Sequence, residues 1–135
     1  MTLIGFCGDN CGLCLRYIAT KSRDIHNLEK VWDLWVRVGW RDKDTSPEEM
    51  ACSGCTSVKS CRYDNVRICA KNKGIDNCGE CIDYPCQEII KVSERTKSYE
   101  RKCKGVCSPG EYERLYKAFF LKKQTLDAIH YRRKQ

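Results

Sequence analysis

Cysteine content constrains this chain more than any other feature of its sequence. Twelve cysteines occur among 135 residues, in four clusters separated by apolar segments. Such a dense set forms disulfides in an oxidising compartment, and serves as metal ligands or redox thiols in a reducing one. Residues 1–6 lack the basic start and apolar stretch of a secretory signal, and no segment is long enough to cross a bilayer. We therefore expect a cytoplasmic protein, without a membrane partner, whose cysteines bind metal.

The spacing of the cysteines supports metal binding. Three Cys-x-x-Cys pairs recur along the chain, at Cys11/Cys14, Cys52/Cys55 and Cys78/Cys81. Each pair encloses a glycine, namely Gly12, Gly54 or Gly79, at a point where we expect a side chain to obstruct the turn. Structural zinc takes four donors, and two such pairs supply them. The repeated spacing therefore indicates tetrahedral thiolate sites.

The candidate metal ligands are all twelve cysteines: Cys7, Cys11, Cys14, Cys52, Cys55, Cys61, Cys69, Cys78, Cys81, Cys86, Cys103 and Cys107. Four of them could close one site locally, namely Cys52, Cys55, Cys61 and Cys69. The first trio (Cys7, Cys11, Cys14) and the later trio (Cys78, Cys81, Cys86) each lack a fourth ligand, which Cys103 and Cys107 could supply. The count allows about two to three zinc ions, and spacing does not assign the partners.

The identity of the metal is a separate question. We favour Zn²⁺, with a [4Fe-4S] cluster in electron transfer as the alternative, because thiolate count and spacing do not separate iron from zinc. A thiol-redox or metal-transfer protein with some free cysteines is a third hypothesis. The spacing Cys7-x₃-Cys11-x₂-Cys14 also matches radical S-adenosylmethionine enzymes, but 135 residues hardly supply the barrel that these enzymes use.

Catalysis is not expected from these ligands. A zinc ion held by four thiolates is saturated, whereas catalytic zinc keeps an open position. His26 and His130 are remote from the cysteine clusters in sequence, and no Ser or Asp constellation accompanies them. We expect both histidines on the exposed surface. The sequence thus favours a binding or adaptor module, with a protein partner left open and no enzymatic activity of its own.

Net charge at first points to nucleic acid. The chain has 25 Lys and Arg against 18 Asp and Glu, a formal charge of +7. Three filled four-thiolate zinc sites would offset most of this excess and leave about +1. The basic residues are then better explained as compensation for thiolates than as a polyanion-binding surface. We therefore expect no nucleic-acid partner.

Hydrophobic periodicity predicts a mostly α-helical, metal-stabilised domain with little or no sheet. An amphipathic helix is expected over 24–38, ended by Gly39, and a shorter one over 65–73, capped by Asp64 and ended by Gly74. Pro85 suits the first position of a further helix, and Ser108-Pro109-Gly110-Glu111 is a capping box. We assign residues 1–95 to a cysteine-rich metal-binding domain and 96–135 to a helical extension packed on it as one unit.

Several of these motifs occur together in a known pattern. The pattern runs Cys7-Gly-x-x-Cys11-x-x-Cys14-x-x-Tyr17, then Cys52-x-Gly54-Cys55, then Cys69-Ala70-x-x-x-Gly74-x-x-x-Cys78-x-x-Cys81-x-x-Tyr84-Pro85-Cys86. Over roughly residues 4–95 it resembles a cysteine-rich domain family of bacteria and archaea of unknown function. The resemblance implies a small soluble domain with metal-binding cysteines and no established reaction.

This chain departs from the family pattern at two places. Family members often have Cys-x-x-Cys where this chain has Cys61-x-x-Asp64, so Asp64 becomes a candidate substitute ligand. Cys103 and Cys107 lie outside the common pattern, and they could restore the ligand count that Asp64 reduces.

Overall fold

Helices dominate the computed structural model, which describes residues 3–53 and 63–133. In chain order the elements are η1 (Cys11–Leu13), α1 (Leu15–Ser22), α2 (Ile25–Val38), η2 (Pro47–Met50), α3 (Asp64–Lys73), η3 (Cys78–Glu80), α4 (Gln87–Ser98), α5 (Glu100–Val106), α6 (Pro109–Leu115), the π-helical segment η4 (Tyr116–Phe120) and α7 (Lys122–Arg133). The described residues contain no strand, and Ile4 and Asn10 form an isolated antiparallel bridge. The mostly α-helical fold class is confirmed.

Local capping explains where two of these helices begin and end. Asp24 accepts a hydrogen bond from the His26 backbone N–H at 2.9 Å, and Gly39 ends α2 in the left-handed region at φ +88°. Ser108 and Glu111 form the expected reciprocal capping box at the start of α6, with Pro109 at its first position. The predictions for these two helices are confirmed.

Two predicted helix starts are wrong. Asp64 is the first residue of α3 and not its cap, because its carboxylate pairs with Arg67 one turn later, at 2.9 Å. Pro85 lies before the next helix, which starts only after Cys86; the first helical hydrogen bond there runs from the Ile90 N–H to the Cys86 carbonyl.

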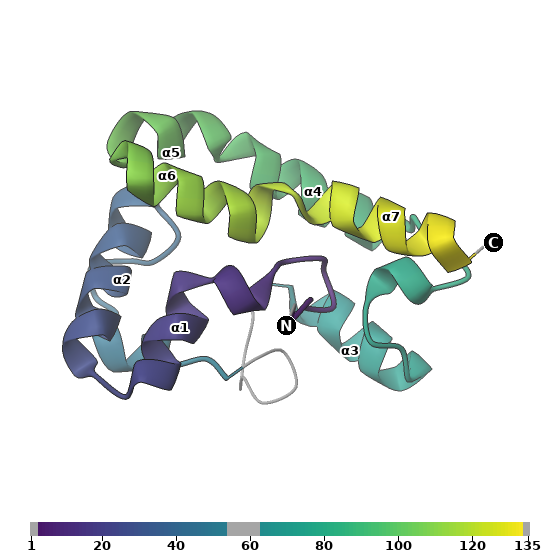
Figure 1. Ribbon diagram of the computed structural model, residues 1–135, viewed down its shortest axis with the longest axis horizontal. Helices are drawn as coiled ribbons and strands as arrows, with labels where there is room; N and C mark the ends of the chain where they lie inside the picture. The colour runs from purple at the N-terminus through teal and green to yellow at the C-terminus, as the bar shows by residue number, and fades with distance from the viewer. Residues whose placement is uncertain (1–2, 54–62, 134–135) are drawn as a thin grey trace.

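The helices are arranged around a long hairpin (Figure 1). α4 and α5 follow one another in line, and the chain turns after Cys107 so that α6, η4 and α7 run back beside them. α1 and α2 pack together at one end of the molecule, and α3 and η3 lie at the other. Across the described ranges, each helix is too short or too polar to span a membrane.

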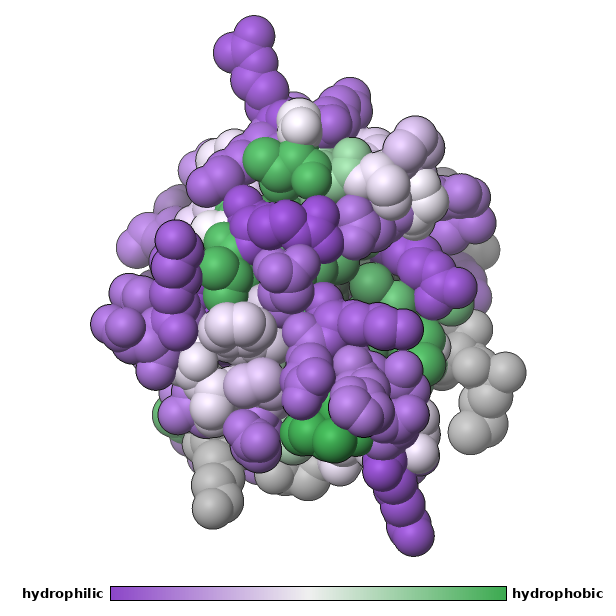
Figure 2. Space-filling model, turned by 90° about the vertical axis from the view of Figure 1, so that its left-hand side faces the viewer, coloured by the Kyte–Doolittle hydropathy of each residue, from purple (hydrophilic) through white to green (hydrophobic). Residues whose placement is uncertain are grey.

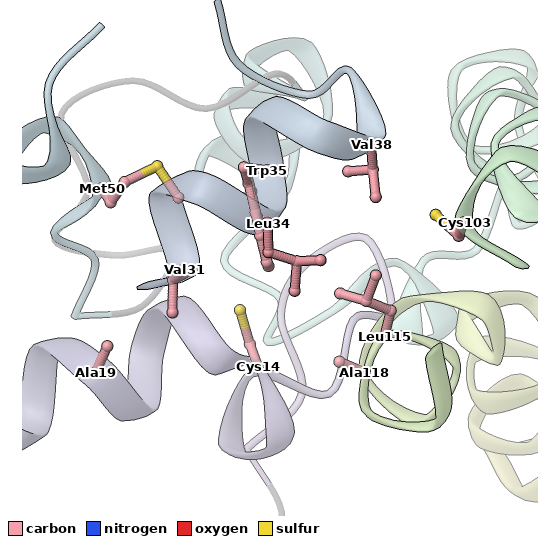
Figure 3. Close-up of a cluster of buried hydrophobic side chains, with 10 residues drawn as sticks. All are labelled: Cys14, Ala19, Val31, Leu34, Trp35, Val38, Met50, Cys103, Leu115 and Ala118. Atoms are coloured by element: carbon pink, nitrogen blue, oxygen red, sulfur yellow. The ribbon is translucent and has the colours of Figure 1, made fainter. Parts of the chain in front are cut away.

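Two clusters of buried side chains hold this arrangement together. In the larger one, shown in Figure 3, side chains of α1, α2, α5 and α6 point toward one another around Leu34, Trp35 and Leu115. The smaller cluster joins Phe6, α3, α4 and the fully buried Leu126 of α7. Burying a leucine completely contributes roughly 1.5–3 kcal/mol, so α7 is a structural part of the domain.

The surface at the α2 end is consistent with this inward packing. Figure 2 shows this end, where hydrophilic side chains cover most of the face and hydrophobic ones are scattered between them. The apolar stripe of α2 faces inward, since Val31, Leu34, Trp35 and Val38 are all buried. The visible face therefore presents scattered apolar spots and no broad apolar patch.

Candidate functional site

One set of cysteines gathers at the α3 end of the molecule. We call it the outer thiol group; its members are Cys69, Cys78, Cys81 and Cys86. They come from α3, from the two ends of the η3 turn and from the residue that precedes α4. The Cys78 thiol interacts electrostatically with all three of the others. Cys69 is therefore a fourth thiol near the later trio; the sequence suggested Cys103 or Cys107 as the fourth ligand, and that assignment stays a prediction.

The η3 turn in this group is held tightly by its surroundings. The Cys78 N–H donates to the Phe6 carbonyl at 2.9 Å, and the Gly79 N–H donates to the buried Asn77 side chain at 2.9 Å. A Cβ at Gly79 would lie 2.8 Å from the Leu126 carbonyl oxygen of α7. The prediction that a side chain would obstruct this turn is confirmed for Gly79.

Charge around the outer thiol group comes from its sulfurs, from Lys73 and from the Asp83 carboxylate, 3.3 Å from Lys73 Nζ. Burial, followed by the Cys86, Cys81 and Cys69 thiols, raises the pKa of Cys78 to about 12. Lys73 Nζ donates a hydrogen bond to Cys81 Sγ at 3.0 Å, and this contact raises the pKa of Lys73. The Asp83 N–H also donates to Cys81 Sγ, at 3.4 Å. Without a metal, Cys78 keeps its proton at neutral pH; metal binding would release thiol protons.

A second set of cysteines lies in the middle of the molecule. We call it the inner thiol group; its described members are Cys11, Cys14 and Cys52, which line one cavity of about 140 Å³. Burial raises the pKa of Cys14 to about 11, and Asp9 and Cys52 add to the shift. The Cys11 N–H donates to the Leu3 carbonyl at 2.8 Å, and the Cys52 N–H donates to Thr20 Oγ1 at 2.9 Å.

The lining of this cavity also includes aromatic rings and a buried ion pair. Trp35, Trp40 and Phe119 line it and meet edge to face, with ring centroids 5.1 to 5.8 Å apart. Lys122, whose side chain is only 4% exposed, lies 2.8 Å from Asp9 Oδ1. Burial alone would lower the pKa of Lys122, but the Asp9 carboxylate reverses this and raises it. The inner thiol group thus shares its cavity with a buried cation.

The remaining described cysteines belong to neither group. Cys7 is buried in the smaller hydrophobic cluster, and its thiol helps to raise the pKa of Lys122. Cys103 of α5 and Cys107, the residue that follows this helix, have hydrogen-bonded thiols, and burial raises the pKa of Cys103 to about 11. Cys55 and Cys61 lie outside the described residues. Asp64 pairs with Arg67, and a ligand role for any of these residues remains a prediction.

The described part of the chain shows no preformed metal site. In residues 3–53 and 63–133, no group of three or more His, Cys, Asp or Glu side chains stands in a geometry that could hold a metal ion. None of the ten described cysteines forms a disulfide. The thiols of the two groups are therefore neighbours, not ligands at bonding distance.

Two residues of α7 that the sequence analysis did not assign to the site lie beside the outer thiol group. His130 Nδ1 lies 3.2 Å from the carbonyl oxygen of Gly79, and the Tyr84 hydroxyl donates to Asp127 Oδ1 at 2.5 Å. His130 is half-buried, so the prediction of an exposed surface histidine is wrong. Asp127 and His130 are three residues apart and share a helix face, which was the available signal.

Comparison with known proteins identifies the family. The family model described as "Protein of unknown function (DUF3795)" matches residues 3–91, and the chain belongs to this family. The predicted resemblance to an uncharacterised cysteine-rich family is confirmed. Neither the search of curated proteins nor that of solved structures found a match. The matched region holds both thiol groups, whereas α5, α6 and α7 follow it.

Proposed function

We propose that this member of the DUF3795 family binds zinc through its two thiol groups and acts as a non-catalytic binding or adaptor module. The observation that supports the proposal is that three thiols, of Cys69, Cys81 and Cys86, lie close enough to Cys78 to raise its pKa. Four cysteines from separate segments suit a structural zinc ion, which needs four donors and joins segments that a thin core cannot hold.

The donor chemistry of the outer thiol group fits a soft or borderline metal ion. All four candidate ligands are sulfur, which suits zinc or an iron–sulfur cluster and not magnesium or calcium. Lys73 Nζ and the Asp83 N–H already donate to Cys81 Sγ, as second-shell donors do to a metal-bound thiolate. The Cys78 N–H and the Asn77 side chain fix the backbone of the turn, so metal binding would require its thiols to close on the ion by side-chain movement.

The inner thiol group supports a second site. Its three described thiols line one cavity, and Cys55 follows Cys52 at the Cys-x-x-Cys spacing, so we assign Cys55 as the fourth ligand. The buried Lys122 would offset the negative charge of a four-thiolate centre. Bound zinc would be saturated in both groups, and this supports a structural role over a catalytic one.

Metal analysis of anaerobically purified protein tests the proposal. We expect a colourless protein with about two zinc ions per chain and with its ligand thiols protected from alkylation. Cys78→Ser should lose about one zinc per chain, whereas the matched control Cys103→Ala should keep both. A brown, iron-containing protein absorbing near 400 nm (an order-of-magnitude expectation) would replace zinc by an iron–sulfur cluster. A metal-free protein with every thiol titratable would contradict metal binding and favour a thiol-redox function.

A further inference from the structure

A second cavity, of about 550 Å³, lies between the two arms of the hairpin, and we call it the hairpin cavity. Its walls come from α4 on one side and from η4 and α7 on the other, and none of the described residues that line it is a cysteine. Cavities that hold small molecules in proteins usually have about 300–1,000 Å³. We propose that the hairpin cavity binds a neutral, planar heterocyclic molecule, a function beyond the proposed zinc binding.

The π-helical segment η4 forms the aromatic wall of the hairpin cavity. Three of its five residues line the cavity, namely Tyr116, Phe119 and Phe120. The Tyr116 and Phe120 rings stack with their centroids 6.4 Å apart and 29° between their planes, and Tyr116 is 37% exposed. Segments of π-helix are rare and occur frequently at functional sites. An aromatic wall favours a flat ligand, whose ring can stack on the side chains.

The other side of the hairpin cavity is mainly apolar as well. Ile89 is buried and Ile90 is half-buried on α4, and both line the cavity. Tyr84, which precedes this helix, also lines it, and its hydroxyl is engaged because it donates to Asp127 Oδ1. The lining therefore combines apolar and aromatic surface with a few polar groups, which is typical of a site for a small organic molecule.

Charges in the lining balance one another. The charged side chains are three carboxylates and three ammonium groups, namely Glu94, Glu100, Asp127, Lys97, Lys122 and Lys123. Asp127 pairs with Lys123 at 2.7 Å, and Lys122 pairs with Asp9 outside the lining at 2.8 Å. Glu100 likewise lies 4.0 Å from Lys104, so counting these two outside partners leaves the balance unchanged. An ionic ligand would meet no opposite excess of charge to offset its desolvation, and a neutral one needs none.

Two polar side chains on opposite sides of the cavity can recognise the edge of a heterocycle. Ser93 lies on α4 and Gln124 on α7, and both line the cavity. Within residues 3–53 and 63–133, neither side chain has a hydrogen-bond partner. A hydroxyl and a carboxamide can each donate and accept, so they match a ring edge that carries N–H and carbonyl groups together. A hydrocarbon of the same shape would use neither.

Fluorescence titration with riboflavin tests the site without any variant. Riboflavin is neutral and planar, its ring edge carries an N–H between two carbonyl groups, and stacking on aromatic side chains quenches its fluorescence. We expect saturable quenching with a Kd of about 1–100 μM. Flavin mononucleotide, the same ring with a phosphate, should bind no more tightly. Absence of saturable quenching would overturn the site, and binding of flavin mononucleotide at least about tenfold tighter would overturn the neutral ligand.

Polar variants test recognition of the ring edge. Ser93→Ala and Gln124→Ala should each weaken riboflavin binding by about two- to tenfold, because each removes one hydrogen bond. The matched control is Ser98→Ala on the same helix α4, whose hydroxyl donates to the Arg95 carbonyl and does not line the cavity; it should leave the Kd unchanged. Unchanged affinity in both cavity variants would overturn the hydrogen-bonding edge.

A ring variant tests the placement of the ligand against η4. Tyr116→Ala should weaken binding by about two- to tenfold, because it removes one stacking ring from the wall. Tyr131→Ala is the matched control, since Tyr131 is 67% exposed on α7 and does not line the cavity. Equal affinities of these two variants and the wild type would overturn the placement. Zinc content and riboflavin affinity are separate readouts, so either function can fail while the other stands.

Discussion

The inner and outer thiol groups share a residue type and a spacing, yet their surroundings differ. Both contain Cys-Gly-x-Cys in a short 3₁₀ turn, at η1 and at η3. The inner group faces an aromatic wall and the cation of Lys122, which is 4% exposed. The outer group has the half-exposed cation of Lys73 and an exposed ligand candidate in Cys69. The Cys-x-x-Cys spacing therefore predicts a turn, whereas the exposure of the thiols and the charges beside them depend on the packing around that turn.

One helix contacts both groups. α7 begins with Lys122, which reaches Asp9 beside the inner cavity, and its last turns place His130 and Ile129 against the η3 turn. This helix follows the region matched by the DUF3795 family model. The shared thiol motifs are thus supported in this chain by a segment outside that region. The comparison can be tested through the contacts that α7 makes at each end.

The largest expected effect on stability comes from Lys122, the buried cation beside the inner thiol group. Lys122→Met should destabilise the fold by about 3–5 kcal/mol, because it leaves the Asp9 carboxylate in a largely dry site without its cation. Urea denaturation measures the loss. Lys73→Met, the matched change at the outer end, removes an exposed cation and should leave the free energy of unfolding close to that of the wild type.

A double variant separates the ion pair from simple packing. Lys122→Met combined with Asp9→Leu should be more stable than Lys122→Met alone, because well-packed apolar groups often replace a buried pair without loss. If the double variant is no more stable than the single one, the charge of Asp9 is not what Lys122 offsets, and the contrast between a buried inner cation and a partly exposed outer one fails.

The next largest effect on stability distinguishes Gly79, in the η3 turn, from Gly12, in the η1 turn. Gly79→Ala should cost about 1–3 kcal/mol, because the new methyl would lie 2.8 Å from the Leu126 carbonyl and 3.0 Å from Ile129 Cβ. Gly12→Ala, at the equivalent position of the inner group, meets nothing closer than 3.5 Å and should be nearly neutral. Thermal unfolding of the two variants checks this.

The space around Gly12 contradicts the sequence interpretation for this turn, which expected a side chain to obstruct all three Cys-x-x-Cys turns. Should Gly12→Ala prove as costly as Gly79→Ala, the restriction would lie in the Cys-Gly-x-Cys turn itself and not in the docking of η3 on α7. Gly105→Ala offers a further reference, because a Cβ there meets nothing within 4 Å and α5 is already helical.

Local features of the fold could be predicted and long-range ones could not. The helix over 24–38 and the capping box at Ser108 depend on residues close in sequence, and both were found where expected. The neighbours of Cys69 depend on how α3 packs, which proximity in sequence does not indicate; its pairing with Cys61 lies outside the described residues and stays a prediction. His130 meets Gly79 only because α7 runs back along the hairpin. No periodicity signal indicated that η4 would be π-helical.

The smallest expected effect on stability concerns the ion pair between Arg37 and Glu111. This pair lies outside both thiol groups, so it is a reference for changes made within them. Arg37 Nη2 pairs with Glu111 Oε2 at 2.7 Å, joining α2 to α6. The hydrogen bond from Arg37 lowers the pKa of Glu111 to about 2, from 4.5 in the unfolded chain. A lowered folded pKa stabilises the protein above the unfolded pKa, so this contribution is complete above about pH 4.5 and disappears as the pH falls toward 2.

Both side chains are about one-third exposed, and solvent screening reduces the gain to about 1 kcal/mol. Glu111→Gln should therefore lower the free energy of unfolding by about that amount at neutral pH and by almost nothing near pH 2. Glu113→Gln, on the same helix, is the control, because Glu113 pairs only with the exposed Lys117. The loss in Glu111→Gln should be the same with and without bound zinc, since the ion pair lies outside both thiol groups. A loss that grows on zinc removal would instead link α2 and α6 to the thiol groups, and the molecule would then respond to metal as one unit.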